Sequence, residues 1–494
     1  MKIRYILLTL FLFACLPMRM SAQNSNSSEE DEFIDFRKDL QGEYKDFRKE
    51  INKEYIDFLS KAWKEYRLFQ GKAPDETPKP LSPVLVQEEK NYREMLVSVG
   101  GVIDRPVEQG FAMKGEAEPN IPDRMNSPEV SFPKTVDSLQ LDYFGAKLGV
   151  HYQNRQFFLP AITEQYVGNL WTEMANSRFS SLLADMLRHK EKMQMNDWAY
   201  FLLVDKVAAR LSTLQGEDCR TVFKHFLLVQ SGYDVRLARI DRFLVLLVPI
   251  HEEVYACSYL EMNGRMYYAI SDKDLKSYSN IFTYQLPDKL IQTPCLSLMI
   301  HKELLLPMQP KAFCIKAAGL EVKGEVNQNK IEFYKEYPLC ELSVYARATP
   351  DDKLMKPLLS SLSARLADKP FAEVLNQLLL WVQKGFCYQT DGEQFGYEKP
   401  FFIEETFYYP ACDCEDRSIL FAYLVNRLLG REVILLDYPG HVATAVCVDK
   451  EEMEGAYVQL QGKKYMVCDP TYVNAKIGQV MPFCKTKQPK VIRL

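Results

Sequence analysis

Histidine is scarce in this sequence, with only six among 494 residues. His441 is the single histidine that follows His301, so the last third of the chain contains one candidate imidazole base. The chain also lacks a GxxxxGK[ST] loop, which cradles nucleotide phosphates, and an HExxH helix, which binds catalytic zinc. The sequence therefore gives no indication of a P-loop nucleotidase or of a zinc protease of that type.

Clusters of basic residues are missing as well, and the formal net charge is −5. A protein that binds DNA or RNA usually carries a basic patch, so we predict no nucleic-acid partner. The Cys412-x-Cys414 pair is a weak sign of metal binding, because no second thiol or histidine pair accompanies it. We therefore expect neither a metal ion nor another cofactor.

No apolar run in the sequence is long enough to cross a membrane comfortably. Lys2 and Arg4 precede an apolar stretch over 5–16, and the small-residue pair at 21–22 is suitable for cleavage. This order of charge, apolar run and small residues is that of a secretory signal peptide. We predict that residues 1–22 are removed and that the protein is exported, to the periplasm or to the cell exterior.

Cys15 supports a second interpretation of the same region. Residues 12–15 resemble a bacterial lipobox, with Phe13 at a position where a small residue is usual, and a lipid on Cys15 would anchor the protein to a membrane. Cys15 is one of twelve cysteines, so eleven remain in the mature chain. Because eleven is odd, at least one thiol stays free or pairs with another molecule, even in an oxidising compartment.

An eleven-residue repeat follows the leader, with consecutive copies over 32–42, 43–53, 54–64 and 65–75. Its apolar residues recur at intervals of three, four and four: Phe33, Phe36, Leu40, Tyr44, Phe47, Ile51, Tyr55, Phe58, Ala62, Tyr66 and Phe69. Eleven residues over three turns predict a long, nearly straight amphipathic helix over 30–71. Its apolar stripe needs a surface, which is either the protein's own body or, in a coiled-coil-like contact, a second copy or a partner helix.

The rest of the chain is too long for one ordinary hydrophobic core. Proline clusters and changes of pattern predict a Pro-rich linker and irregular segment over 72–136 and a first α+β unit over 137–280. A strand-rich connection over 281–344 and a second α+β unit over 345–494 complete the predicted organisation.

A cysteine at a predicted helix start is the first candidate for catalysis. Asp413 is suited to N-cap a helix, Asp416 stands where a capping box carries its acid, and Gly430 is a fitting stop. Cys414 therefore lies in the first turn, where the helix N-terminus lowers the pKa of a thiol. Glu415 and Asp416 oppose that effect, so activation of the thiol requires a protonated histidine as its partner.

Two further residues of catalytic type stand at the ends of predicted strands. A strand over 433–436 is followed by a Pro-Gly turn, and His441 opens the next strand. A later strand over 465–468 ends at Asp469. Residues at strand ends beside a helix start can converge, so Cys414, His441 and Asp469 would serve as thiol nucleophile, imidazole base and carboxylate that orients the base.

The unit over 137–280 repeats the order of predicted elements of the C-terminal unit, which indicates an internal duplication. Cys219 opens a helix in this copy, but Phe243 or Leu244 falls at the place of His441. Because the copy lacks a base, we expect it to be inactive.

Residues 345–485 resemble the transglutaminase-like superfamily, a branch of the papain-like cysteine enzymes. The resemblance rests on Asp-Cys-Glu-Asp-Arg-Ser at 413–418, Gly-His at 440–441 and Cys-Asp-Pro-Thr-Tyr at 468–472. Residues 137–280 resemble a degenerate copy of the same fold. The implied fold class is α+β, with a papain-like, transglutaminase-like domain duplicated behind a long N-terminal helix.

The resemblance also implies roles for individual residues. Cys414, His441 and Asp469 take the positions of the catalytic triad, and the backbone N–H of Cys414 would be one oxyanion donor. Tyr408 and Tyr409 are the nearest candidates for an aromatic oxyanion partner or substrate wall.

The expected reaction is acyl transfer at an amide bond of a peptide or protein through a thioester on Cys414. Hydrolysis, as by a peptidase or amidase, is favoured because water is always available as the second acceptor. Two alternatives stay open. One is a cross-linking acyltransferase that passes the acyl group to an amine, and the other is a non-catalytic binding or scaffold protein that keeps the fold without turnover.

Overall fold

A computed structural model gives the fold of residue 50 and of residues 52–74, 77–86, 94–104, 137–152, 157–177, 179–212, 216–286, 295–449 and 454–494. The predicted signal peptide, the lipobox at Cys15 and the repeats before residue 50 lie outside these ranges. Within them, none of the helices is both long and apolar enough to pass through a bilayer.

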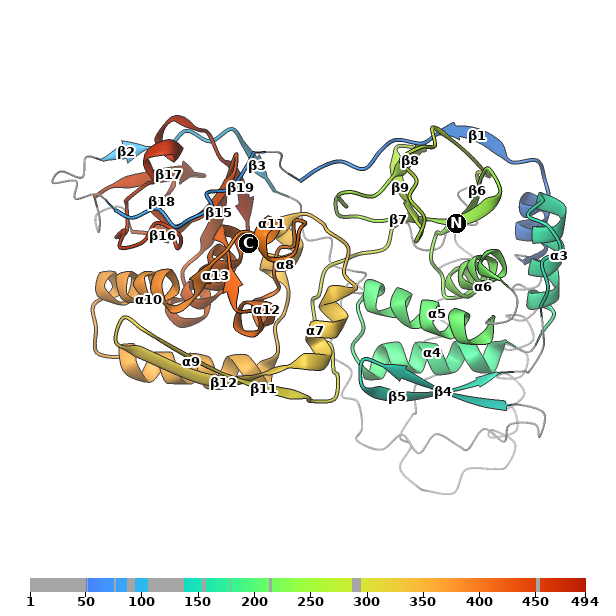
Figure 1. The fold of residues 1–494 in the computed structure, drawn as a ribbon, viewed down its shortest axis with the longest axis horizontal. Coiled ribbons are helices and arrows are strands. Elements are labelled where there is room, and N and C mark those ends of the chain that lie inside the picture. The colour runs from blue at the N-terminus through green and yellow to red at the C-terminus, as the bar shows by residue number, and fades with distance from the viewer. Residues whose placement is uncertain are drawn as a thin grey trace, which may run out of the picture.

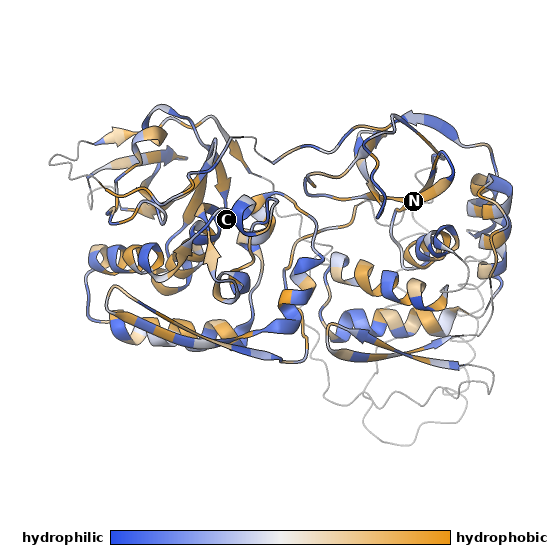
Figure 2. Cartoon of the chain, viewed as in Figure 1, coloured by the Kyte–Doolittle hydropathy of each residue, from blue (hydrophilic) through white to orange (hydrophobic). Residues whose placement is uncertain are grey.

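The molecule is a mixed α+β structure, 36% helical and 28% strand, with curled sheets, as the sequence predicts at this coarse level. Figure 1 shows two halves side by side, one formed mainly by the green middle of the chain and the other by its yellow-to-red C-terminal part. The helices carry hydrophobic residues on one side and hydrophilic residues on the other (Figure 2), the pattern of helices that cover a core.

The first half combines a β-hairpin, a group of helices and a sheet. The hairpin and helices are β4 (Asp137–Tyr143), β5 (Ala146–Tyr152), α3 (Glu164–Ala175), α4 (Ser180–Lys192), α5 (Asp197–Leu211) and α6 (Glu217–Gln230). The sheet strands are β1 (Lys64–Arg67), β6 (Arg236–Ile240), β7 (Phe243–Pro249), β8 (Tyr259–Met262), β9 (Arg265–Ile270) and β10 (Asn280–Thr283). Their spatial order is β1-β10-β6-β7-β9-β8.

The second half has the same kinds of parts. Its hairpin and longer helices are β11 (Pro310–Ala317), β12 (Leu320–Asn327), α7 (Gln328–Lys335), α9 (Asp352–Leu366), α10 (Phe371–Gly385) and α13 (Cys414–Leu429). Shorter elements are α8 (Leu342–Arg347), β13 (Cys387–Tyr388), α11 (Asp391–Gln394), α12 (Ile403–Tyr408), β14 (Ala411–Cys412) and a 3-10 turn, η2 (Pro482–Thr486). The segment 281–344, predicted to be strand-rich, thus contributes both a hairpin and a helix.

The sheet of the second half is formed by β2 (Met95–Leu96), β3 (Gly101–Ile103), β15 (Val433–Tyr438), β16 (His441–Val448), β17 (Ala456–Leu460), β18 (Lys463–Cys468) and β19 (Lys490–Arg493). Its order is β2-β17-β18-β16-β15-β19-β3.

The two sheets share one connectivity. In each, a central hairpin (β6-β7 or β15-β16) is joined by the later strand of a second hairpin (β9 or β18), and the last strand (β10 or β19) returns beside the first. In each, a short strand from the N-terminal region, β1 or β3, pairs with that last strand. The preceding hairpins also match, because β4-β5 contacts α4 and α5 as β11-β12 contacts α9 and α10.

The predicted N-terminal helix ends earlier than the repeat suggests. Among the described residues the helix covers 52–59 and is followed by a turn and by β1, so the prediction of one helix to residue 71 is wrong at this end. The exposed edge of β10 offers backbone partners to Lys64–Arg67, and this antiparallel pairing replaces the helical hydrogen bonds. A tertiary contact therefore overrides the local period.

The buried face of this helix also differs from the predicted stripe. Tyr55 and Leu59 are 2% and 0% exposed, whereas Phe58 is only partly buried. The Tyr55 ring stacks on Trp171, and its hydroxyl lies 2.9 Å from His225 Nε2. The described end of the repeat thus packs on the protein's own body, which is the first of the two surfaces considered above.

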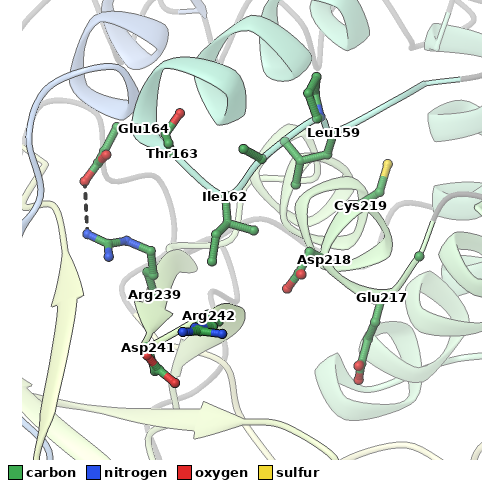
Figure 3. Close-up of a pocket in the computed structure, with 13 residues that line it drawn as sticks. Leu159, Ile162, Thr163, Glu164, Glu217, Asp218, Cys219, Arg239, Asp241 and Arg242 are labelled. Atoms are coloured by element: carbon green, nitrogen blue, oxygen red, sulfur yellow. Dashed lines mark hydrogen bonds and ion pairs between the residues drawn. The ribbon is translucent and has the colours of Figure 1, made fainter.

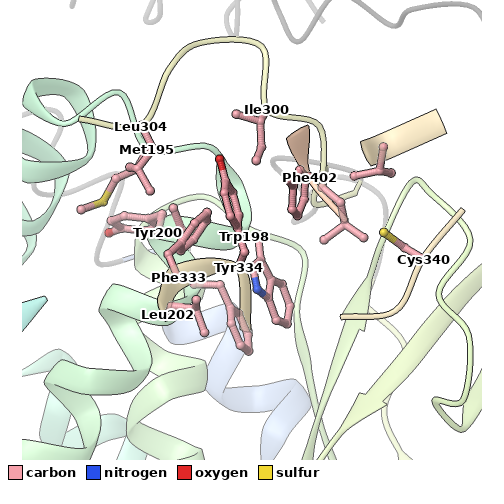
Figure 4. Close-up of a cluster of buried hydrophobic side chains, with 14 of the residues drawn as sticks. Met195, Trp198, Tyr200, Leu202, Ile300, Leu304, Phe333, Tyr334, Cys340 and Phe402 are labelled. Atoms are coloured by element: carbon pink, nitrogen blue, oxygen red, sulfur yellow. The ribbon is translucent and has the colours of Figure 1, made fainter. Parts of the chain in front are cut away.

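An aromatic cluster joins the two halves (Figure 4), and both contribute to one continuous hydrophobic core. Trp198 of the first half donates its indole N–H to the Glu336 carbonyl oxygen at 2.9 Å, just after α7. Tyr334 of α7 stacks on Phe402, with ring centroids 4.3 Å apart. Helix α7 therefore connects the core of the first half to the segment that leads to α13.

Leu59→Ala tests whether the N-terminal helix is part of the folded body. The substitution leaves a cavity at a fully buried position, so we expect the free energy of unfolding to fall by about 2–4 kcal/mol. Asp57→Ala, on the exposed face of the same helix, should change it by no more than about 0.5 kcal/mol. Urea unfolding of the full chain measures both values, and equal stability of the two variants would contradict the packing described here.

Candidate active site

Helix α13 begins at Cys414, as the sequence predicts. The Asp416 carboxylate accepts the Asp413 backbone N–H at 3.1 Å and the Phe401 N–H at 2.8 Å, so one acid satisfies two buried donors at the helix start. The helix ends at Gly430, whose φ of +62° is a left-handed conformation that glycine adopts without strain. Local capping thus fixes where the thiol stands.

His441 and Asp469 stand at the ends of neighbouring strands. The Pro-Gly turn closes the β15-β16 hairpin with Gly440 at φ +77°, and His441 is the first residue of β16. Asp469 directly follows β18, which pairs with β16 in antiparallel register. Strand pairing therefore brings together two residues that lie 28 positions apart.

A buried hydrogen bond joins these two residues. His441 Nε2 lies 2.8 Å from Asp469 Oδ2, and the two residues are 2% and 1% exposed. The other carboxylate oxygen accepts the backbone N–H groups of Thr471 and Tyr472 at 2.9 and 3.1 Å. The carboxylate is thus held by the backbone and in turn fixes the plane of the imidazole ring.

The Cys414 thiol makes no hydrogen bond to His441, whose ring lies near Phe483 and Tyr438, at centroid distances of 5.7 and 6.5 Å. Ser418, one turn further along α13, donates its hydroxyl to the Val442 carbonyl at 3.0 Å, which ties α13 to the residue after His441. The thiol itself donates to Glu415 Oε2 at 3.1 Å, while His441 Nδ1 is buried and has no hydrogen-bond partner. The structure therefore forms the His–Asp pair and leaves the thiol–imidazole hydrogen bond unmade.

The environment of Cys414 disfavours the thiolate in this arrangement. Cys414 is 0% exposed, and burial is the main reason why its pKa is raised well above the ordinary value. The Glu415 and Asp413 carboxylates raise it further, whereas Lys79 and the Val442 backbone act in the opposite direction. The opposition from neighbouring acids, expected from the sequence, is thus present and is joined by desolvation.

A lysine that the sequence did not single out lies among these acids. Lys79 Nζ lies 2.5 Å from Glu398 Oε1, 3.0 Å from Asp413 Oδ2 and 3.9 Å from Asp391 Oδ2, and it also contacts Glu415. We refer to Asp391, Glu398, Asp413 and Glu415 as the acidic cluster. Glu415 therefore accepts hydrogen bonds from both the Cys414 thiol and the Lys79 ammonium group.

The acidic cluster cannot be fully ionised around one ammonium group. Burial lifts the pKa of Asp391 to about 9 and that of Glu398 to about 7, and nearby carboxylates add to the effect. Asp416, next to the cluster, behaves in the same way, with its pKa raised to about 8. Glu415 is the exception, because Lys79 outweighs its burial and holds its pKa at about 2.

Three oxygens of this cluster, from Asp391, Glu398 and Glu415, lie within 4.8 Å of one another, a spacing that could hold a metal ion. The Lys79 ammonium group lies among them and supplies the positive charge there.

The predicted wall residues Tyr408 and Tyr409 end α12 and precede the thiol helix. Lys311 Nζ lies 3.8 Å above the Tyr408 ring, and Tyr409 packs edge-on against Phe395. These contacts do not involve Cys414, so their role in an oxyanion site stays a prediction.

Tyr388 is a site residue that no motif in the sequence singled out. It is close enough to Cys414 for the two groups to interact electrostatically, and its hydroxyl donates to the Pro80 carbonyl at 2.7 Å. Gln383 was also missed, and it binds the Asp469 carbonyl oxygen through Nε2 at 3.0 Å. Neither residue belongs to a recognisable motif, and α11, α12 and β14 separate both from the thiol helix, so the sequence offered little signal for them.

The corresponding place in the first half has a cysteine but no imidazole. Phe243 opens β7 as His441 opens β16, and the Leu244 N–H donates to Asp218 Oδ1 at 2.7 Å. Cys219 borders a cavity of about 580 Å³ together with Arg239 (Figure 3). Burial and Asp218 raise the pKa of the Cys219 thiol to about 11, so this thiol is not activated.

All eleven cysteines in the described part of the chain are free thiols. Comparisons with known protein families, with curated proteins and with solved structures found no match to this chain.

Asp391→Asn should make stability less dependent on pH. The folded-state pKa of Asp391, about 9, lies far above its ordinary value of 3.8, so the folded protein keeps a proton that the unfolded chain releases. Stability contributed by that proton is complete below about pH 4 and is lost as the pH rises to about 9. Asparagine cannot ionise, and its amide oxygen can still accept the Lys399 N–H.

The unfolding free energy should fall between pH 5 and pH 9 in the wild type. In the variant we expect this fall to be smaller by at least about 1 kcal/mol. Urea unfolding at both pH values measures the difference. Asp368→Asn, an exposed change after α9, is the matched control and should follow the wild type. If the unfolding free energy of Asp391→Asn changed with pH as that of the wild type does, the raised pKa assigned to Asp391 in the acidic cluster would be wrong.

Proposed function

We propose that this protein is a cysteine amide hydrolase of the transglutaminase-like type, acting on peptide or protein amides through Cys414, His441 and Asp469. The observation that carries the proposal is the buried His441–Asp469 hydrogen bond, which leaves His441 Nδ1 unpartnered. Cys414 stands at the N-terminus of α13, the helix that packs against the strand opened by His441. A carboxylate on one ring nitrogen leaves the other available for a proton from the nucleophile.

The proposed reaction has two halves. His441 Nδ1 takes the thiol proton, and the Cys414 sulfur attacks the amide carbonyl carbon to form a tetrahedral oxyanion near the Cys414 backbone N–H. The carbon–nitrogen bond then breaks, and His441 returns the proton to the leaving amine. Water attacks the resulting thioester with His441 as base, which releases the acid and restores the thiol.

This mechanism requires a rearrangement of the Cys414 side chain. The thiol points its proton at Glu415, 3.1 Å away, so it must turn to His441 Nδ1 before it can be deprotonated. Glu415 lies next to Cys414 and is tied to Lys79, so the charge balance of the acidic cluster decides how readily the thiol turns. Because Cys414 is buried, the residues that cover it must also move before a substrate can reach the thiol.

A duplicated papain-like architecture is part of the same proposal. It is supported by the shared strand order of the two sheets and by the equivalent places of Cys219 and Cys414 at the starts of α6 and α13. The first copy would then serve as a structural partner of the second, since Phe243 replaces the base.

A non-catalytic binding protein is the second candidate. The specific observation in its favour is the fully buried thiol, whose proton is directed away from the imidazole. A cross-linking acyltransferase would use the same triad with an amine in place of water. Product analysis by mass spectrometry separates hydrolysis from amine incorporation.

His441→Ala should reduce labelling and turnover together. Loss of the base is expected to lower amide cleavage by about a hundredfold or more, and labelling of Cys414 by a peptidyl vinyl sulfone should slow in parallel. Asp469→Asn should keep the fold and reduce turnover, because the imidazolium loses its charged partner. A fluorogenic peptide-amide library, read with the full-length chain, supplies the substrate. Equal labelling in wild type and His441→Ala would exclude the pairing.

Cys219→Ser should leave amide cleavage within about twofold of the wild type, because no imidazole is placed to activate that thiol and its pKa is raised. The assay is the same library, with a thermal melt as a control for folding. A variant that melts normally yet loses turnover would show that the first copy takes part in catalysis.

A further inference from the structure

Residues 77–86, which we call the docked segment, run along the candidate site although they come from the far end of the chain. A methyl group added at Gly440, next to His441, would meet the Pro78 carbonyl oxygen at 2.8 Å and Thr77 Cγ2 at 2.9 Å. The Val473 N–H donates to the Val84 carbonyl at 2.9 Å, and the Val86 N–H donates to the Val473 carbonyl at 3.1 Å. The docked segment therefore touches the chain at Gly440, next to His441, and at Val473, four residues after Asp469.

Its middle reaches the thiol side of the same site. Pro80 accepts the Tyr388 hydroxyl at 2.7 Å, and Lys79 enters the acidic cluster, where Glu415 also holds the Cys414 thiol. The docked segment contacts its surroundings through backbone carbonyls, a backbone N–H group, one charged side chain and the apolar side chains of Val84 and Val86. Those are the groups by which an extended peptide is recognised.

The acidic cluster surrounds the ammonium group of Lys79, but not every carboxylate oxygen of the cluster has a hydrogen-bond partner. The Lys79 side chain is 15% exposed, while those of Asp413, Glu415 and Asp391 are 3% exposed or less. Asp413 Oδ1 is buried without a hydrogen-bond partner, so a buried acceptor remains beside the ammonium group. Burying several carboxylates is costly unless a cation pairs with them, which gives the cluster a strong preference for a positive charge.

We propose that the acidic cluster is a subsite for the lysine side chain of a peptide substrate, and that the docked segment occupies it as a ligand within the same chain. That the bound peptide is a substrate rests on the proposed function. Binding of its lysine in the acidic cluster does not depend on turnover. Lys79 marks the place of the substrate ammonium group, and Glu415 links that place to the nucleophile. The occupied site is then closed, with the thiol held by Glu415 and away from His441.

The test measures access to Cys414 in the full-length chain. Iodoacetamide modification of Cys414, followed by mass spectrometry, should be at least about tenfold faster in Lys79→Met than in the wild type. Loss of the ammonium group releases the docked segment and exposes Cys414, and this gain in access outweighs the loss of the charge by which Lys79 lowers the pKa of the thiol. Lys72→Met is the matched control, since Lys72 lies in the same N-terminal stretch and pairs with Glu253. It should react like the wild type, and no acceleration in Lys79→Met would overturn the proposal.

Peptides added in trans identify the subsite. A synthetic peptide with the sequence of residues 77–86 should protect Cys414 of Lys79→Met from iodoacetamide, and the same peptide with norleucine at the lysine should protect about tenfold less. Equal protection by both peptides, or by neither, would overturn the lysine subsite. If Lys79→Met does not fold, Val86→Pro replaces it, because proline removes the N–H donated to Val473 and loosens the segment while the acidic cluster keeps its lysine.

Cleavage assays separate this proposal from the hydrolase itself. Protection by the lysine peptide with no amide cleaved would uphold the subsite and refute the hydrolase. Cleavage of amides without a preference for lysine over norleucine, together with no protection, would uphold the hydrolase and refute the subsite. The expected result is cleavage by Lys79→Met with a preference for lysine-containing peptides of about tenfold or more.

Discussion

The charge balance at the start of α13 is the constraint on which the candidate site depends. Several acids are buried around the first turn of this helix, and the Lys79 ammonium group pairs with four of them. Arg417, which is 1% exposed, adds a second buried cation and donates to the Phe386 carbonyl at 2.8 Å. Without such cations the helix start would hold unpaired buried charge, so the position of the thiol and that of Lys79 are parts of one electrostatic arrangement.

The local part of this site could be predicted from the sequence because local rules decide it. The cap at Asp413 and the left-handed stop at Gly430 place Cys414 in a first turn, and the Pro-Gly turn places His441 at a strand start. The pairing of β16 with β18 then fixes the position of Asp469, which directly follows β18. Each of these features follows from hydrogen bonds between residues close in sequence or in adjacent strands, which is why the pattern was informative.

Lys79 could not be predicted in the same way. It is one lysine in a proline-rich stretch, more than 300 positions from Asp413 and Glu415, and no periodicity marks it. The one available sign was the excess of acidic residues beside Cys414. It predicts that a cationic side chain lies nearby but does not identify the residue. The prediction of the N-terminal helix was wrong at its end for a related reason. Lys64–Arg67 has a helical period, but it pairs as a strand with the free edge of β10, which is distant in the sequence.

The N-terminal stretch also has a consequence for how the chain reaches its fold. Its helix and β1 belong to the first half, whereas the docked segment, β2 and β3 belong to the second (Figure 1). β3 pairs with β19, which follows every other strand in the part of the chain that the structure describes, so the second sheet is completed only after β19 has been synthesised. Contacts of such high contact order form late and slowly. Lys79 is likewise made more than 300 positions before Asp413 and Glu415, so it can neutralise the acids around Cys414 only after that distant part of the chain has been synthesised.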